Sequence, residues 1–504
     1  MASPFLDILK YNLSGQFLAR LLSFAISAYL VRHVPMNLLG LINVRMYLLY
    51  STICFLVREP FRKTCMNADL TVKQAQKYAF LCVPFSIVVT FIITFLFTIR
   101  TSTETGFDDH FFTLSIIFGA SALIETFVEP CAIFALKMGQ NKLFSITQSI
   151  STFLPKFIAF VLIVGTNTSP IVALSYSQLA SSLVYAIIYI VSFMRSRYPF
   201  EEHGRQYSYE KSEIKLMTSL VFHSSLKQVL TEGAGYVMVF MNVLSLEQQG
   251  VYNTIERLGS LVTRLVLTPL EESAFMYFST RLNRQSGNTA NSSKKSAEAE
   301  KTYFAVLRII ISVGLTVFVF GLPYSALVIR LYGGQVLVDN QGHQMLMAYL
   351  VYLLIMAVNG LTECFAFASM NSSEILFHGY ILTGSIILHL ILNWALSFWI
   401  GAFGFIFANC VNSALRIYFN YRYISGHLKS LPSIFTILPS LRLCGSLLLN
   451  FGIIFIASLI FGSDPNDISL IIANVAIGGI LFLAVIVYLH QNEHLFTPLM
   501  EKQD

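Results

Sequence analysis

The chain has 504 residues, of which 55% are hydrophobic and only 12% are charged, and its formal net charge is +6. Soluble domains carry roughly a quarter charged residues, so this composition excludes a soluble globular enzyme. The small, scattered positive charge also gives no reason to expect a nucleic-acid partner. Apolar runs of about twenty residues recur along the chain, and a helix of that length crosses the hydrocarbon core of a bilayer. The sequence therefore predicts an all-α integral membrane protein.

Fourteen apolar runs are long enough to be read as membrane-spanning helices. In chain order they are centred on Leu22, Leu49, Val89, Phe118, Phe160, Leu183, Val239, Val262, Leu315, Leu354, Leu388, Phe407, Ile453 and Ala476. Successive connections between spans lie on alternating sides of the membrane. Most Lys and Arg residues outside the spans fall in the connections of one side, which the positive-inside rule assigns to the cytosol. Only Arg32, Arg100 and Arg330 fall in the connections of the other side. Because the number of spans is even, we expect a multi-pass protein with both termini in the cytosol.

An internal repeat suggests how these spans are grouped. Gly40-Leu41-Ile42-Asn43 opens the second span and Gly250-Val251-Tyr252-Asn253 opens the eighth, and each is followed by an apolar run that ends at a proline beside acidic residues. The repeat predicts two related six-helix lobes with a central cavity between them, near the membrane midplane. The expected parts are an N-terminal lobe at 1–194 (spans one to six), a cytosolic linker at 195–216, a C-terminal lobe at 217–425 (spans seven to twelve), and two extra C-terminal spans with a cytosolic tail at 426–504.

Basic side chains lie inside several spans, where a charged group at the bilayer centre costs about 2.5–3.5 kcal/mol. They are Arg20 on span one, Arg45 on span two, Lys227 on span seven, and Arg257 and Arg264 on span eight. On their own spans these groups outnumber the acidic residues near them. The sequence leaves two arrangements open, either separate acidic partners within the bundle or one cationic, water-filled cavity that accepts an anion.

A second group of charged residues lies within the spans or at their ends, in part at the three- and four-residue spacing of one helix face. Buried charges need partners, so we expect these residues to pair and either to lock the bundle or to bias a conformational equilibrium. The group of structural or gating charges comprises Arg58, Glu59, Arg62, Glu125, Glu129, Glu271 and Glu363.

A phosphate-bearing lipid is the anion that best fits such a cavity. The guanidinium group binds phosphate through two parallel hydrogen bonds, and the diphosphate of a lipid-linked sugar combines high negative charge with a hydrophilic glycan. A lateral opening would leave the isoprenoid tail in the lipid. We expect no catalytic residue, metal or cofactor, because the seven cysteines form no C-x-x-C pair and no histidine has a second ligand at helical spacing.

Motifs spread over nearly the whole chain carry a resemblance to a known family. They include Asn43-Val44-Arg45, Arg58-Glu59-Pro60-Phe61-Arg62, Lys227-Gln228-Val229-Leu230-Thr231-Glu232-Gly233, Gln249-Gly250-Val251-Tyr252, Leu331-Tyr332-Gly333-Gly334, Asn359-Gly360 and Thr362-Glu363-Cys364-Phe365. With these motifs the sequence resembles the Rft family of endoplasmic reticulum membrane proteins, within the multidrug/oligosaccharidyl-lipid/polysaccharide flippase superfamily.

The resemblance implies a fourteen-helix fold with two lobes around a central cavity. It also implies that the protein moves the dolichyl-diphosphate-linked, mannose-rich heptasaccharide from the cytosolic to the lumenal leaflet for N-glycosylation, by alternating access and without covalent chemistry. By position, Arg20, Arg45 and Arg264 are similar to arginines of superfamily members that flip lipid-linked cell-wall precursors. The implied partners are the dolichyl-diphosphate oligosaccharide, membrane lipids and other N-glycosylation machinery.

Three other functions were weighed against this one. A non-transporting scaffold or accessory factor of the lipid-linked oligosaccharide pathway fits the sequence as well. A cation/drug antiporter of the same fold would need a membrane carboxylate that faces an apolar pocket, and the basic excess on the early spans of each half disfavours it. A polytopic glycosyltransferase is disfavoured by the short lumenal loops.

Overall fold

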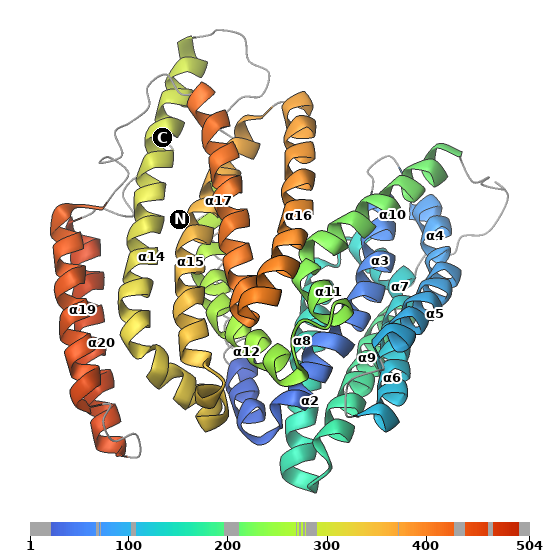
Figure 1. The fold of residues 1–504 in the computed structure, drawn as a ribbon. Helices are drawn as coiled ribbons and strands as arrows, with labels where there is room; N and C mark the ends of the chain where they lie inside the picture. Colours follow the sequence, from blue (N-terminus) through green and yellow to red (C-terminus); the bar gives the residue numbers. More distant parts are fainter. Residues whose placement is uncertain are drawn as a thin grey trace. The chain divides into compact units, whose positions relative to one another are not determined.

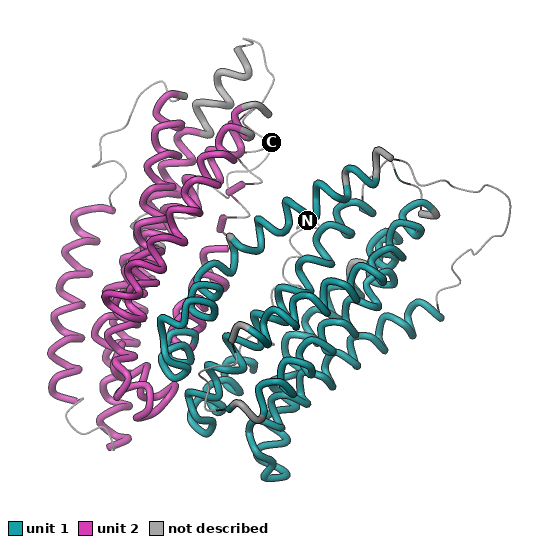
Figure 2. Tube along the Cα trace, turned by 45° about the vertical axis from the view of Figure 1, so that its right-hand side comes forward, with its two compact units in different colours: residues 1–253 teal, residues 254–504 magenta. Residues whose placement is uncertain are grey.

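The computed structural model describes residues 22–66, 70, 72–101, 107–195, 211–268, 270–271, 274–275, 278, 290–370, 372–427, 439–461 and 467–492. All regular secondary structure in these ranges is helical (Figure 1). The chain folds into two compact units, Met1–Asn253 and Thr254–Asp504 (Figure 2). The boundary between the units falls within a helix and not in the predicted linker at 195–216, most of which lies outside the described residues. The predicted division into lobes stays a prediction.

Unit 1 begins with helical residues 22–33 and continues with a short helix and a π-helical segment. Its labelled elements are α2 (Met36–Gly40), η1 (Leu41–Met46), α3 (Tyr47–Cys65), α4 (Val72–Phe80), α5 (Cys82–Thr101), α6 (Asp108–Phe127), α7 (Glu129–Lys137), α8 (Asn141–Thr166), α9 (Pro170–Arg195), α10 (Lys211–Thr231), α11 (Gly233–Phe240) and the first half of α12 (Leu246–Val262). Helix α3 packs against α5, α6 and α10, and therefore lies at the centre of this unit.

Unit 2 contains the rest of α12 and the helices that follow it. These are the π-helical segment η3 (Thr263–Leu267), α14 (Ala290–Asp339), α15 (Gly342–Ser369), α16 (Ser372–Ile400), α17 (Ala402–His427), α19 (Leu441–Phe461) and α20 (Ile468–Asn492). Helix α15 packs against both α14 and α17. An apolar cluster that includes Phe320, Leu443 and Val485 joins α19 and α20 to α14.

Eleven of the described helical segments are long and apolar enough to cross a membrane, and together they contain eleven of the fourteen predicted span centres. The other three centres are Leu22, Val239 and Val262. Leu22 lies at the edge of the described residues, while Val239 and Val262 lie in α11 and α12, which are short or carry several polar residues. The protein is therefore a multi-pass helical membrane protein, and the count of fourteen spans stays a prediction.

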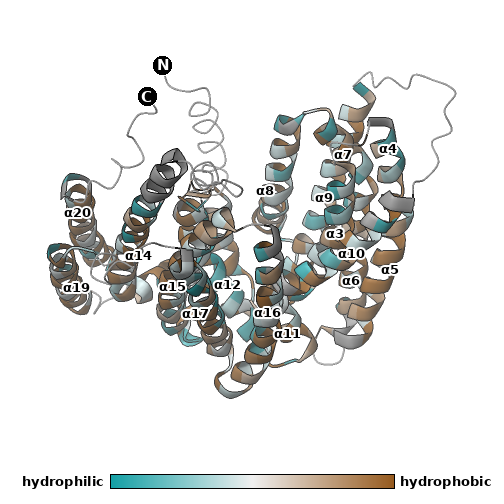
Figure 3. Ribbon diagram, turned by 90° about the horizontal axis from the view of Figure 1, so that it is seen from above, coloured by the Kyte–Doolittle hydropathy of each residue, from teal (hydrophilic) through white to brown (hydrophobic). Residues whose placement is uncertain are grey.

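The apolar helices differ in how much of their surface is covered by protein. In the span that contains α3 the most apolar window is 67% buried, whereas in the span that contains α5 it is 22% buried. Phe91 and Phe95 on α5 stack on each other and stand exposed on a helix whose surface is dominated by hydrophobic residues (Figure 3). An uncovered apolar face of this kind fits contact with lipid chains, so we assign α5 to the lipid-facing surface of unit 1.

Two glycines of the internal repeat touch in unit 1, where α2 crosses the first turns of α12. A Cβ atom on Gly40 would overlap the carbonyl oxygen of Leu246, and it would lie 3.0 Å from the amide nitrogen of Gly250. A Cβ atom on Gly250 would in turn overlap the carbonyl oxygen of Met36. Since backbone atoms cannot move aside as a flexible side chain can, this crossing accepts only glycine at both positions.

Replacing Gly40 with Ala should therefore destabilise unit 1 by about 1–3 kcal/mol, the usual cost of overpacking a close contact. The measurement is the thermal unfolding of the purified protein in detergent. Gly165→Ala on α8 is the matched control, because a Cβ atom there would meet nothing within 4 Å. Equal melting temperatures for the two variants would contradict the close backbone contact at Gly40.

Candidate functional site

The five basic residues that were predicted to hold an anion are divided between the two units. Arg45 lies in unit 1 on η1, and Lys227 lies in the same unit on α10. Arg257 on α12 is half-buried, and Arg264 on η3 is exposed; both belong to unit 2. Arg20 lies outside the described residues. The prediction that all five share one cavity stays a prediction.

Arg45 is the most deeply buried member of this set that the structure describes. Its side chain emerges from the π-helical turn that follows α2, and the residue is only 3% exposed. The guanidinium donates from Nε to Oε1 of Gln249 at 3.4 Å and from a terminal nitrogen to Oδ1 of Asn242 at 3.2 Å. Both acceptors are amide oxygens, and together they orient the guanidinium. Inserted π-helical turns of this kind are frequent at functional sites.

A cavity of about 390 Å³ lies beside this guanidinium. Its lining is Asn37, Arg45, Asn242, Val243, Leu244, Ser245, Leu246 and Glu247. We call it the Arg45 cavity. Half of its lining residues belong to the connection between α11 and α12, which turns at Asn242 with a left-handed φ of 49°. Polar side chains and backbone groups of this connection surround one buried positive charge, an arrangement that suits a hydrated anionic group.

Glu247 is the acidic residue in this lining and is exposed. A carboxylate near a bound diphosphate repels it, so Glu247→Gln should tighten the binding of a diphosphate lipid. We expect about a three- to tenfold gain, because a like charge at a few ångströms in a partly solvated site contributes on the order of 1 kcal/mol. Titration of purified protein with a fluorescent diphosphate lipid measures the effect. Weaker binding by Glu247→Gln would show that this carboxylate makes a favourable contact with the ligand and does not repel it.

Lys227 has a carboxylate partner on another helix. Its Nζ donates to Oε1 of Glu59 on α3 at 2.9 Å, and it also lies 5.5 Å from the centre of the Phe55 ring. Lys63 makes a second ion pair with the same Glu59 oxygen at 2.9 Å. Both lysine side chains are more than two-fifths exposed. Of the two arrangements that the sequence left open, Lys227 follows the one with an acidic partner.

Two arginines of α3 pair with two carboxylates that are fully buried where α6 meets α7. Arg58 contacts Oε2 of Glu125 at 2.6 Å and Oε2 of Glu129 at 3.2 Å. Arg62 pairs with both carboxylate oxygens of Glu129, with a terminal nitrogen donating at 3.0 Å. The expected pairing of these four residues is present, and it ties α3 to the junction of α6 and α7. We call them the four-charge cluster.

Neighbouring side chains complete the surroundings of the four-charge cluster. The Ser182 hydroxyl on α9 donates to Oε1 of Glu125 at 2.8 Å. The Arg58 guanidinium lies 5.1 Å from the centre of the Tyr185 ring, and Arg62 lies 5.1 Å from that of Phe144. The cluster thus joins α3, α6, α7, α8 and α9. This network has the geometry of an interhelical lock rather than of an open ligand site.

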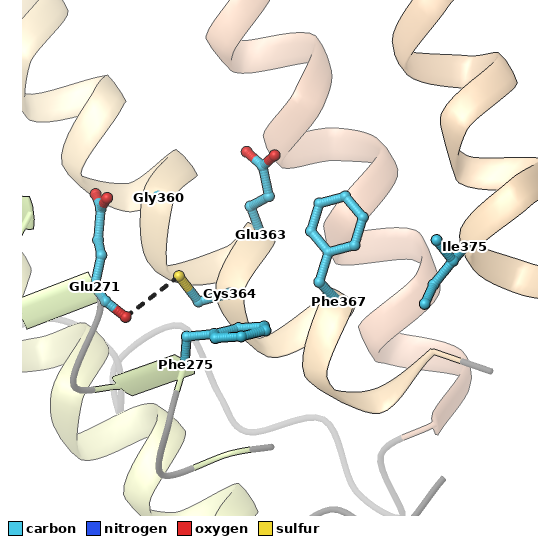
Figure 4. Close-up of a pocket in the computed structure, with 7 residues that line it drawn as sticks. All are labelled: Glu271, Phe275, Gly360, Glu363, Cys364, Phe367 and Ile375. Atoms are coloured by element: carbon cyan, nitrogen blue, oxygen red, sulfur yellow. Dashed lines mark hydrogen bonds between the residues drawn. The ribbon is translucent and has the colours of Figure 1, made fainter. Parts of the chain in front are cut away.

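Unit 2 holds a second cavity, of about 470 Å³, with a different chemical character (Figure 4). It is lined by Glu271, Phe275, Gly360, Glu363, Cys364, Phe367 and Ile375. The Cys364 thiol donates to the backbone carbonyl of Glu271 at 3.6 Å, and Glu363 makes an ion pair with Arg416 on α17. We call it the acidic cavity. Two carboxylates and two phenyl rings make it unsuited to a diphosphate.

Sequence reasoning missed Gln249 and Asn242, which hold Arg45, because a neutral amide in a span gives no sign of its partner. The available signal for Gln249 was its position in the Gln249-Gly250-Val251-Tyr252 motif. The sequence also did not identify Arg416 on α17 as the partner of Glu363.

Comparison with known proteins assigns this chain to a family. Residues 6–502 match the family model described as Rft protein. A Caenorhabditis elegans relative named Man(5)GlcNAc(2)-PP-dolichol translocation protein RFT1 is 32% identical over 98% of this chain and 97% of its own length. The mouse relative of the same name is 31% identical over 83% of this chain and 81% of its own length.

Solved structures share the fold at low sequence identity. An inward-facing multidrug-resistance MATE transporter of the MOP superfamily aligns with a TM-score of 0.65 at 14% identity, covering 81% of this chain and 95% of its own. The lipid II flippase MurJ in an inward closed conformation aligns with a TM-score of 0.62 at 14% identity, covering 94% of this chain and 98% of its own. With the match of the family model along nearly its whole length, the chain belongs to the Rft protein family.

Proposed function

We propose that this protein moves a dolichyl-diphosphate-linked, mannose-rich oligosaccharide from the cytosolic to the lumenal leaflet of the endoplasmic reticulum membrane for N-glycosylation. The observation that carries the proposal is the relation to translocation proteins of this substrate along nearly the full chain. The buried Arg45 guanidinium at the wall of a polar cavity supports it, because it supplies a charge that a diphosphate needs inside a membrane.

The physical task is to carry a charged and hydrated head group past hydrocarbon. A carboxylate-sized ion loses several kcal/mol or more of solvation free energy in a low-dielectric interior, so the head group must travel in a polar passage. The dolichyl tail has no such cost and can remain in lipid. Arg45 is the proposed diphosphate ligand with the strongest structural support, and Arg20, Lys227, Arg257 and Arg264 are proposed to act with it at other stages of transport.

Several finer features belong to the same proposal. The chain would have fourteen spans in two six-helix lobes plus two C-terminal helices, with both termini in the cytosol and alternating access between the lobes. The four-charge cluster would keep the N-terminal lobe rigid while the lobes move, since its four side chains join five helices of unit 1 through buried contacts. No covalent step is proposed, and other N-glycosylation proteins are proposed partners.

Reconstituted vesicles test the transport step directly. Purified protein in liposomes should speed the exchange of a labelled heptasaccharide diphosphate-dolichol between leaflets, read out by its accessibility to an added glycosidase or lectin. Heat-denatured protein and protein-free vesicles are the controls. If folded protein binds the glycolipid but gives no acceleration over these controls, the protein acts as a non-transporting accessory factor of the same pathway.

The acidic cavity favours a second candidate, a cation/drug antiporter. Glu271 supplies a carboxylate and Phe275 and Phe367 supply aromatic faces, which suit an organic cation, while Glu363 is paired with Arg416. Uptake of a fluorescent organic cation into vesicles under a proton or sodium gradient decides between the two. We expect no gradient-driven uptake. Uptake that is abolished by Glu271→Gln would replace the glycolipid with a cation as the substrate.

A further inference from the structure

The contact between Gly40 and Gly250 places a buried glutamine against Arg45. Arg45 follows Gly40 by little more than one helical turn, and Gln249 directly precedes Gly250. The close approach of the two backbones at the glycines therefore brings the side chain of residue 249 within reach of the η1 turn. A larger residue at either glycine would separate the two helices and draw Gln249 away from the guanidinium.

The amide of Gln249 is held at both ends. Its Nε2 donates to the carbonyl oxygen of Leu244 at 2.9 Å, and its Oε1 accepts from Nε of Arg45 at 3.4 Å. The residue is 0% exposed, so each bond replaces one to water that burial has removed. Because Leu244 presents a carbonyl, the amide nitrogen must face Leu244 and the amide oxygen must face Arg45. The site thus requires a side chain with a donor at one end and an acceptor at the other.

We propose that Gln249 is a positioning residue that holds the Arg45 guanidinium at the wall of the Arg45 cavity, oriented to bind the diphosphate of the lipid substrate. This inference rests on the proposed function. Leu244, which anchors the amide, also lines the cavity, so the glutamine links the cavity wall to the guanidinium. Asn242, which belongs to the α11–α12 connection, accepts a second hydrogen bond from the same guanidinium.

Substitutions at position 249 separate positioning from packing. Gln249→Met keeps much of the volume and removes both hydrogen bonds. Gln249→Glu keeps the shape, places a carboxylate oxygen against the Leu244 carbonyl, and cancels the charge of Arg45. The matched control is Gln248→Glu, which adds the same charge at the neighbouring position. Gln248 is exposed and pairs with Ser245 in a reciprocal cap at the start of α12, where a glutamate serves equally well.

The measurement is the affinity of the full chain in nanodiscs for a fluorescent polyprenyl-diphosphate oligosaccharide, together with the melting temperature of each variant. We expect Gln249→Met and Gln249→Glu to weaken binding about tenfold or more. Gln248→Glu should weaken it only about threefold, the repulsion expected from one exposed carboxylate bonded to the cavity-lining Ser245. In an Arg45→Ala background, Gln249→Met should have no further effect, because a positioning residue acts only through the group it positions. Gln249→Glu should melt below the native chain, because its carboxylate faces the Leu244 carbonyl, so binding is measured at a temperature at which every variant is folded.

Two results would overturn the inference and leave the proposed function intact. In the first, the native chain binds the lipid and both Gln249 variants bind it with the same affinity. This result would show that Arg45 needs no positioning by this amide. An equal loss on adding Gln249→Met to the native chain and to Arg45→Ala would assign Gln249 a purely structural role. If the native chain binds the diphosphate glycolipid no better than empty nanodiscs do, the proposed function and the inference both fail.

Discussion

Replacing Arg45 with Ala should weaken binding of the dolichyl-diphosphate oligosaccharide by about 100-fold. Removing one partner of a buried, hydrogen-bonded charge pair costs about 2–5 kcal/mol, and the diphosphate would lose a charge partner whose guanidinium is buried. Arg45→Lys should fall between the native chain and Arg45→Ala, because lysine keeps the charge but loses the planar pair of donors. Equilibrium binding in nanodiscs at fixed ionic strength measures all three.

Arg32→Ala is the matched control for this prediction, since Arg32 is an exposed arginine of the same unit. It should leave the affinity within about twofold of the native value, because exposed charges are screened at ordinary salt. The melting temperature of Arg45→Ala should fall by a few degrees, because the buried Oε1 of Gln249 loses a hydrogen bond, so the affinities are compared at a temperature at which both proteins are folded. Normal affinity in a folded Arg45→Ala protein would show that the diphosphate does not bind in this cavity.

Replacing Glu129 with Ala should destabilise the protein by about 3–5 kcal/mol, the usual cost of leaving a buried charge without its partner. Glu129 is fully buried and contacts both Arg58 and Arg62, so its loss removes the carboxylate partner of Arg62 and leaves Arg58 with Glu125 alone. We expect a much lower melting temperature and a poor yield of monodisperse protein. Fluorescence-detected size exclusion after heating measures both in crude detergent extracts.

Glu59→Ala provides the contrast on α3. Glu59 also pairs with two basic residues, but these lysines are 43% and 45% exposed, and exposed ion pairs contribute about 0–1 kcal/mol. Its melting temperature should therefore fall by no more than a few degrees. If Glu129→Ala and Glu59→Ala are equally stable, the four-charge cluster does not lock the helices of unit 1.

Hydropathy predicted most of the helices because the cost of placing polar groups in hydrocarbon is large and local. It was least informative for α11 and α12, where polar residues shorten the apolar runs, and these helices lead into and out of the α11–α12 connection that lines the Arg45 cavity. Spans that line a polar passage must carry the residues that weaken their own hydropathy signal. The least apolar spans are therefore informative about function.

The distribution of charged residues along the sequence predicted the ion pairs of the four-charge cluster but not the ion pair of Lys227. The pairing of Arg58 and Arg62 with Glu125 and Glu129 could be predicted because buried charges need partners and these residues lie at comparable depth. For Lys227 the count considered acidic residues on its own span, whereas its partner Glu59 lies on α3. Sequence spacing describes neighbours on one helix, and it carries little information about partners supplied by packing.

The glycine motif shows what a repeat can and cannot reveal. Gly40 and Gly250 were read as equivalent positions of two repeats, and the structure places them in direct contact in unit 1. That contact depends on how the two segments pack, which the repeat alone does not give. Gln249 escaped notice for the same reason, since its importance comes from lying beside a crossing point.

The most direct test of the account is photo-crosslinking of the substrate to the Arg45 cavity. A photoreactive amino acid at Val243, which lines that cavity, should capture a radiolabelled dolichyl-diphosphate oligosaccharide in native membranes, and Arg45→Ala should abolish the crosslink. The same probe at Phe275 in the acidic cavity should give none. Crosslinking at Phe275 and not at Val243, or at Val243 with undiminished yield in Arg45→Ala, would contradict the claim that Arg45 holds the diphosphate.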